Sequence, residues 1–550
     1  MTKSRKRPLE LWHLISIAIT LLYLLFLIVP MFNILKESVY ENGRFTLKYF
    51  IQFFSEPYYF NTILNSFKIS IATTLFSLLV GVPLAYLYNL YRIHGRSVVQ
   101  VLIILSSMSA PFVGAYAWIL LLGRYGLITK FFAELGIALP SIYGFRGVVL
   151  VLTTRLYPLV FMYVSGALRN VDNSLLEASQ NLGVRGIKRF FKVVVPLCTP
   201  SILAAALMVF MRAMADFGTP LLIGEGYRTF PVEIYKQYVG ETSQNYNFAA
   251  AISVIAIVIT AIVFLVQKVA SEKFSFKMNA LHSIERKKAK PVTSFFIHAY
   301  TYIVVAISML PQVYLVYCSF RNTNAFGNFT KGLSLNSYKN AWKYVRTALP
   351  NTLIIGLSTM VIVVLMSILI AYMVVRRKNT MNNVLDTMSM IPYIIPGSVI
   401  GIALVLTFSK GWLVLTGTMA IMIIAMVIRR IPYTIRSSVA VLQQIPITTE
   451  EASISLGASK LKTFFKVTTP MMASGIVSGA ILSWVSIITE LSASIMLYSA
   501  RTQTLTLSIY VLVSRGTDGA ACAVSTILLL FTVISLALFM RVSKNKDIVM

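Results

Sequence analysis

Long uncharged stretches of apolar residues restrict this chain to folds that a lipid bilayer can surround. Of its 550 residues, 57% are hydrophobic and only 12% are charged, about half the charged share of a typical soluble domain. Inside a bilayer every backbone polar group needs an internal partner, so the sequence predicts an all-α membrane protein. Stretches close to the roughly 20 residues that a crossing needs are 15–30, 69–90, 249–266, 354–375 and 523–540.

Hydropathy predicts about twelve spanning helices, six on each side of a polar, basic segment at residues 271–294. This segment is predicted to be a cytoplasmic linker between a first half, residues 1–270, and a second half, residues 295–550. The predicted spans of the first half are 11–33, 62–90, 98–122, 146–168, 198–222 and 248–269. Those of the second half are 295–318, 351–375, 383–408, 412–436, 472–497 and 517–541.

Lysine and arginine gather in alternate loops and indicate which side faces the cytoplasm. The net charge of +30 would point to nucleic acid in a soluble protein, but cytoplasmic loops of membrane proteins carry the same excess. We therefore expect membrane lipid and no nucleic acid as partner, with both termini cytoplasmic in a bacterial cytoplasmic (inner) membrane. The cations lie at positions 3, 5–7, 92, 96, 185, 188, 189, 192, 287, 288, 290, 376–378, 460, 462, 466, 541, 544 and 546.

An internal repeat organises the chain. Residues 177–196 (EASQNLGVRGIKRFFKVVVP) and 451–470 (EASISLGASKLKTFFKVTTP) are identical at eleven of twenty positions without a gap, at an offset of 274 residues. Earlier positions repeat at an offset of 286, which matches Tyr86 with Tyr372. Because the matched block is polar, chance similarity between apolar helices does not explain it. The sequence predicts a parallel duplication of one six-helix unit.

The repeated block reads as a helix, a tight turn and a second helix. In a capping box a hydroxyl caps the helix and a glutamate three residues on reaches back to the cap. Gly183 and Gly457 then allow the chain to turn, and Pro196 and Pro470 suit the first turn of the next span. A single such helix would usually be a connector, whereas two copies favour two docking surfaces for a two-fold partner. The predicted boxes are Ser174 with Glu177 and Thr448 with Glu451.

This block resembles the EAA motif of binding-protein-dependent ABC importer permeases, with serine in place of the second alanine in both copies. The resemblance covers nearly the whole chain in two passes and implies a type I importer fold. It also implies that the motif helix docks into a cleft of an ATP-binding subunit, so that a fused pair of halves needs two such subunits. Import further implies an extracytoplasmic substrate-binding protein. The docking residues that the resemblance assigns are Glu177, Ala178, Gly183, Glu451, Ala452 and Gly457.

Two further segments resemble the ferric iron branch of this family. They are ADFGTPLLIG at 215–224 and TELSASIMLY at 489–498. Thiamine and phosphonate permeases have similar local sequence, and a polyamine permease is a further alternative. From a different class, an ion-gradient-driven secondary transporter would explain twelve helices but not the duplicated polar block.

Two carboxylates lie in apolar sequence, at Asp216 and Glu490, matched at the 274-residue offset. Buried carboxylates are costly in a membrane, so the pair is expected to line or gate the substrate pathway. The alternative is structural pairing, since Arg212 precedes Asp216 by four residues, the spacing of a helical ion pair. Arg155 and Arg429 are also matched, and we expect them to extend toward the membrane interface.

The sequence has no pattern for chemistry of its own. It contains no GxxxxGK[ST] phosphate loop, so ATP is expected to bind to separate subunits. Its four histidines form no catalytic constellation, and its three cysteines stand far apart in apolar sequence. No catalytic residue, metal site or cofactor is therefore predicted, and the chain is expected to be a translocation subunit rather than an enzyme.

Overall fold

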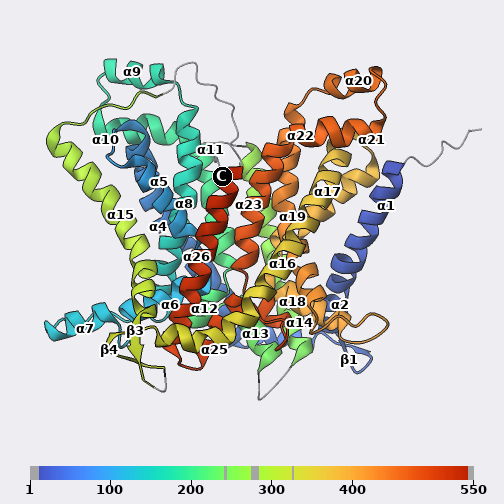
Figure 1. Cartoon of the computed structure of the whole chain (residues 1–550), viewed down its shortest axis with the longest axis horizontal. Coiled ribbons are helices and arrows are strands. Elements are labelled where there is room, and N and C mark those ends of the chain that lie inside the picture. The colour runs from blue at the N-terminus through green and yellow to red at the C-terminus, as the bar shows by residue number, and fades with distance from the viewer. Residues whose placement is uncertain (1–10, 241–244, 274–283, 325–326, 543–550) are drawn as a thin grey trace, which may run out of the picture.

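The computed structural model describes residues 11–240, 245–273, 284–324 and 327–542. These residues form a helical membrane protein of two similar sets of helices, which confirms the predicted fold class (Figure 1). The chain termini that we expect to be cytoplasmic, and residues 274–283 of the predicted linker, lie outside the described residues. In the part of the linker that is described, Lys287 forms an isolated parallel β-bridge with Tyr91, which directly follows helix α4 (Pro57–Leu90).

Six helical spans of the first half, some of them made of more than one element, occupy the positions of the six predicted spans. They are α1–η1–α2 (Leu11–Tyr23, Leu24–Ile28, Val29–Val39), α4 (Pro57–Leu90), α5 with α6 (Arg96–Met108, Pro111–Leu122), α8 (Phe145–Arg169), α10–η2–α11 (Gly186–Arg189, Phe190–Val194, Val195–Met214) and α14 (Tyr246–Lys273).

The second half repeats this order. Its elements are α15 (Pro291–Ser319), α16 (Asn336–Arg376), α17 with α18 (Thr380–Ile394, Gly397–Phe408), α19 (Met419–Gln444), α21–η3–α22–α23 (Lys460–Thr463, Phe464–Thr468, Thr469–Met471, Ala473–Ile488) and α26 (Asp518–Val542).

Among the described residues, nine helices are long and apolar enough to cross a membrane, and two bent helix pairs raise this number to eleven. The twelfth position belongs to α19, which is long enough but carries Arg429, Arg430 and Arg436. Its match α8 also carries three arginines, Arg146, Arg155 and Arg169, but they are spread along the whole helix. The arginines of α19 are therefore closer together than those of its repeat partner.

The third span of each half is broken, whereas the sequence predicted continuous helices at 98–122 and 383–408. The first break falls before Pro111 and the second before Pro396, where α17 and α18 meet at a bend of 111°. Proline disfavours helical backbone in the residue before it, and both Ala110 and Ile395 have extended backbone. These two predictions of a continuous helix were wrong for that reason.

The fifth span of each half ends earlier than predicted. Helix α11 stops at Met214 instead of residue 222, and α23 stops at Ile488 instead of residue 497. In both halves the chain then leaves helical geometry before a short helix begins. The predicted fourth span of the second half was also misplaced, since α19 covers Met419–Gln444 rather than 412–436.

The first span of each half packs against the other half. Figure 1 shows α1 beside α16 and α17 at one edge, and α15 beside α4 and α5 at the opposite edge. Trp12 of α1 contacts Tyr372 and Phe464 of the second half, with ring centroids 4.7 and 5.1 Å away. Ile297 and Val305 of α15 likewise belong to the apolar cluster of the first half. Each half is thus completed by a helix from the other.

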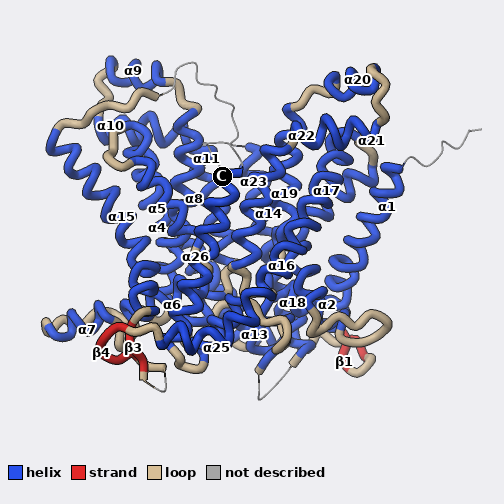
Figure 2. Tube along the Cα trace, viewed as in Figure 1, coloured by secondary structure: helices blue, strands red, loops and turns tan. Residues whose placement is uncertain are grey.

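Short elements close both ends of the bundle. Figure 2 shows two small hairpins at the end opposite α9 and α20. Asn42 and Gly43, at the turn between β1 and β2, both have positive φ, as a two-residue hairpin turn of matching twist requires. The hairpins are β1 with β2 (Tyr40–Glu41, Arg44–Phe45) and β3 with β4 (Arg321–Thr323, Phe329–Leu333), both antiparallel. The short helices are α3 (Lys48–Ser55), α7 (Leu127–Glu134), α9 (Asn173–Asn181), α12 (Gly218–Ile223), α13 (Phe230–Val239), α20 (Thr448–Ser455), α24 (Ser494–Leu497) and α25 (Leu505–Ser514).

The exchange of first spans predicts that Trp12 stabilises the second half. Trp12→Ala should lower the free energy of unfolding by about 3 kcal/mol or more, because it removes a buried aromatic side chain. Leu14→Ala, on the exposed face of the same helix, is the control and should have little effect. Thermal unfolding of the purified chain in detergent measures both, and equal shifts would contradict the packing.

Candidate functional site

Two surfaces at one end of the molecule carry the repeated motif. Helices α9 and α20 stand out from the bundle there, each followed by a basic helix that leads into the fifth span (Figure 1). Beside the motif, Leu182 is 82% exposed and Leu456 is 90% exposed. An exposed leucine on a polar helix, repeated at the matched position, is unusual for a simple connector. The exposed motif residues are Glu177, Ala178, Gly183, Glu451, Ala452 and Gly457.

The predicted capping boxes are absent. Helix α9 begins two residues earlier than expected, and the carboxylate of Asp172 accepts the backbone N–H of Ser174 at 2.9 Å. Glu177 instead accepts a hydrogen bond from the side-chain amide of Asn173 at 2.7 Å. Helix α20 has no side-chain cap, because Ile447 occupies the N-cap position. The glutamates of the motif therefore do not close their own helices.

The predicted glycine turns are confirmed. Gly183 and Gly457 have φ of +79° and +88°, a backbone region that other residues adopt at a cost. In the first copy the N–H of Val184 donates to the carbonyl of Ser179. In the second, Ala458 donates to Ser453. These six-residue bonds are the Schellman ending of a helix, so both copies turn in the same way.

Each motif packs against the second span of its half through a pair of aromatic rings. Phe190 lies 4.9 Å from Tyr86 between ring centroids, and Phe464 lies 4.8 Å from Tyr372. Both phenylalanines belong to π-helical turns, η2 and η3, that join the basic helix to the fifth span. Each motif therefore contacts the second span and is continuous with the fifth span of its half.

The two copies differ in one buried contact. In the second copy Glu450 accepts a hydrogen bond from Nε of Arg376 at 2.8 Å, and both side chains are largely buried. In the first copy the matched positions are Leu176 and Leu90, both buried in the same apolar cluster. The sequence analysis did not single out Glu450. The available signal was that the two matched positions hold a charged pair in one half and two leucines in the other.

A central cavity lies between the two halves. Its volume is about 200 Å³, and residues related by the repeat offset line it from opposite sides. It is bordered by the ends of α11 and α23, by α8 and α19, and by the break between α17 and α18. The matched lining pairs are Arg155 with Arg429, Arg212 with Ser486, Asp216 with Glu490, Phe217 with Leu491 and Gly218 with Ser492.

Asp216 lies where α11 has ended, and its partner is Arg155 of α8 rather than Arg212. Nη1 of Arg155 is 3.0 Å from Oδ1 of Asp216, and the other carboxylate oxygen accepts the N–H of Thr219 at 3.0 Å. The alternative that Asp216 pairs with Arg212 along a helix was wrong, because the helix stops at Met214. The expectation that Arg155 extends to the interface was wrong too, since the carboxylate holds it inside.

Glu490 has the matched position in the second half and two cationic partners. It forms ion pairs with Arg429 and Arg430 of α19. Its Oε1 also accepts the hydroxyl of Ser492 at 2.6 Å and the N–H of Ala493 at 3.1 Å. Arg429, like Arg155, therefore pairs inside the bundle and not at the interface. The sequence analysis had not singled out Arg430.

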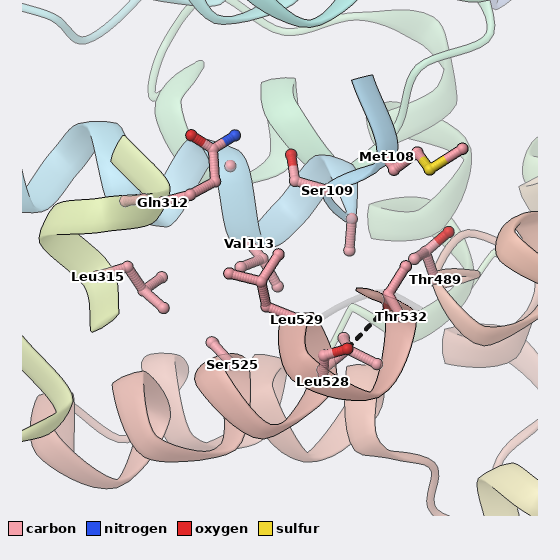
Figure 3. A pocket seen from close by; sticks show the side chains of 13 residues that line it. Met108, Ser109, Val113, Gln312, Leu315, Thr489, Ser525, Leu528, Leu529 and Thr532 are labelled. Carbon is pink, nitrogen blue, oxygen red and sulfur yellow. Dashed lines mark hydrogen bonds between the residues drawn. The ribbon is translucent and has the colours of Figure 1, made fainter. Parts of the chain in front are cut away.

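A second, much smaller pocket lies where α5 and α6 meet α15 and α26 (Figure 3). At about 20 Å³ it is close to the size of one water molecule. Its walls are mostly apolar side chains, with Gln312 of α15 and Ser109 among the polar residues that line it (Figure 3). This pocket is a packing gap where the exchanged first span of the second half meets the broken third span.

The duplicated helical fold, with a central cavity and paired motif surfaces, defines a polytopic permease. The chain belongs to the family of binding-protein-dependent transport system inner membrane components, whose model matches residues 77–275 and 363–546. It is therefore a multi-pass inner membrane protein, a fused tandem permease of the ABC importer class.

Relatives are similar over most of the chain. Ferric transport system permease protein FbpB of Actinobacillus pleuropneumoniae is 28% identical over 531 residues, 93% of this chain and 75% of the relative. Putative ferric transport system permease protein FbpB 1 of Haemophilus influenzae is 27% identical, with 88% and 78% covered. The spermidine/putrescine transport system permease protein PotB of Haemophilus influenzae is 28% identical over 40% of this chain and 78% of its own length.

The difference between the two copies yields a matched test of stability. Glu450→Leu should lower the free energy of unfolding by about 3–5 kcal/mol, because it leaves Arg376 buried without its anion. Adding Arg376→Leu reproduces the leucine pair of the first half and should recover most of that loss. Thermal unfolding in detergent measures both variants. A double variant no more stable than the single one would contradict the pairing.

Proposed function

We propose that this chain is the translocation subunit of an ATP-driven importer, with ferric iron as its substrate. Two ATP-binding subunits dock at the motif surfaces of α9 and α20, and ATP hydrolysis belongs to those subunits. A substrate-binding protein docks at the opposite face. The halves 1–270 and 295–550 act as a tandem pair joined by residues 271–294, with the motif end and both termini in the cytoplasm.

The observation that carries this proposal is the pair of exposed, glycine-ended motif helices at one end of the molecule. Each presents a leucine to solvent, Leu182 or Leu456, and each is coupled through Phe190 or Phe464 to membrane helices. A polar surface that exposes a leucine and packs against membrane helices suits a partner that drives movement. A gradient-driven transporter would have no use for two such surfaces.

Ferric iron is supported by two relatives that align with 93% and 88% of the chain, both of them ferric transport permeases by name. The polyamine relative aligns with less than half of it. Thiamine and phosphonate have no such support among these relatives. We therefore assign the substrate by the relatives that share the fused architecture.

The docking assignment predicts that glycine substitutions at the motif turns uncouple the ATPase. Gly183→Val and Gly457→Val should each weaken co-purification of the ATP-binding subunit at least severalfold, and the double variant should abolish it. The reason is that a β-branched residue resists positive φ and so displaces the exposed turn. Co-purification from detergent-solubilised membranes, followed by quantification of the ATP-binding subunit, measures the effect.

Gly43→Val provides a matched control. Gly43 has the same φ of +79° as Gly183, and neither has an atom within 4 Å of an added Cβ. It lies in the β1–β2 turn at the opposite end of the molecule. This variant should retain the ATP-binding subunit. If the motif variants retain it equally well, the docking assignment is wrong.

The pathway assignment for Asp216 and Glu490 has its own test. Asp216→Asn and Glu490→Gln should each lower uptake of ⁵⁵Fe by about tenfold or more, because the change unpairs arginines on the cavity wall. Uptake is measured in cells and normalised to the amount of folded chain in the membrane. Normal uptake by both variants would remove these residues from the pathway.

A further inference from the structure

We propose that the central cavity accepts oxyanions, so that its substrate crosses either as a free oxyanion or as a ferric ion enclosed by oxyanion ligands. The proposal rests on the pathway assigned above and specifies its substrate chemistry. The observation behind it is the charge of the cavity wall, where arginines outnumber carboxylates.

Four arginines and two carboxylates line the central cavity. The arginines are Arg155, Arg212, Arg429 and Arg430, and the carboxylates are Asp216 and Glu490. The wall therefore carries two positive charges in excess. A substrate of opposite charge is attracted by such a wall, and the attraction is stronger in a confined site than in bulk water.

The two carboxylates have little capacity left for a cation. Both oxygens of Asp216 are engaged, one by Arg155 and one by the N–H of Thr219. Both oxygens of Glu490 are engaged by arginines, and one of them also accepts the hydroxyl of Ser492. A bare metal ion would have to displace these partners and would then meet the unpaired guanidinium groups.

The excess charge comes from two residues that break the repeat. Arg212 is exposed toward the cavity and makes no hydrogen bond or ion pair with any residue that the structure describes, and its match is Ser486. Arg430 is the second cation on Glu490, and its match is Leu156. Each half thus adds one arginine that the other half lacks.

Guanidinium groups suit oxyanions in particular. Their planar N–H donors match two oxygens of a carboxylate or phosphate at once. Tyr433 lines the same cavity, as does Tyr393, whose hydroxyl donates to the sulfur of Met208 at 2.8 Å. In the described part of the chain no group of three His, Cys, Asp or Glu side chains could hold a metal ion. These features favour iron wrapped in oxyanion ligands over iron bound by the protein.

A charge series that makes each half resemble the other tests the proposal. The variants are Arg212→Ser, Arg430→Leu and the double variant, which leaves one arginine for each carboxylate. Arg212→Lys is the control that retains the charge. Uptake of ⁵⁵Fe supplied as its citrate complex is measured below saturation in cells lacking the native copy. It is normalised to the amount of chain in the membrane and to its thermal stability.

Arg212→Ser should lower uptake by about tenfold, the scale of losing one charged hydrogen bond. Arg212→Lys keeps the charge but loses the planar pair of donors, so its loss of uptake should be smaller than that of Arg212→Ser. The double variant should lose at least as much as either single one. Ser486→Glu, which adds a carboxylate at the position matched to Arg212, should also lose uptake. Unchanged or faster uptake by the double variant and by Ser486→Glu would overturn the proposal.

Two labels separate the two sources of oxyanion. Entry of ¹⁴C-citrate or ³²P-phosphate together with ⁵⁵Fe identifies a ferric complex, whereas entry of an oxyanion label without iron identifies a free oxyanion. Failure of the ferric assignment is distinguishable, because a strain lacking this chain would then take up ⁵⁵Fe normally. In that case uptake of ³²P-phosphate by the same variants is measured. A fall in this uptake as positive charge is removed from the cavity would still support the proposal, and unchanged uptake would overturn it.

Discussion

In each half, the helix of the fifth span ends inside the bundle, and an ion pair stabilises the backbone at that end. Asp216 and Glu490 follow the ends of α11 and α23, and each receives an arginine from the neighbouring fourth span. Each carboxylate also accepts a backbone N–H of the short helix that follows. Unpaired charges and free backbone groups are both costly away from water. The ion pair offsets the cost of the charge, and the bond to the backbone N–H offsets the cost of a free backbone group. The central cavity lies beside these contacts.

The rest of the architecture follows from duplicating this arrangement around one cavity. The broken third spans approach it from both sides, and the exchanged first spans α1 and α15 tie the halves together at their outer edges (Figure 1). At the motif end two similar helices are exposed to solvent, and each motif packs on the second span of its half through an edge-to-face pair of aromatic rings. The copies have diverged inside, where Arg376 and Glu450 replace two leucines, but their outer turns remain alike. A partner that binds both copies would keep the exposed turns alike, whereas the buried contacts could differ.

Much of this could be predicted from the sequence, because bilayer length and the repeated block are local signals. Asp216 and Glu490 stood out as charges in apolar sequence, and Gly183 and Gly457 as helix ends. The partner of Asp216 could not be found this way, since Arg212 has helical spacing only if the helix continues past Met214. The breaks before Pro111 and Pro396 were also hidden, because hydropathy does not register a change of direction between two equally apolar segments. The exchange of α1 and α15 leaves no local trace, since an apolar face packs equally well on either half.

We propose above that one chain offers two equivalent docking surfaces to an ATP-binding subunit. Native mass spectrometry of the complex released from membranes in mild detergent tests it most directly, since it counts subunits. The account predicts one copy of this chain with two copies of the ATP-binding subunit. A stable complex with a single ATP-binding subunit, or uptake by a chain that carries none, would contradict it.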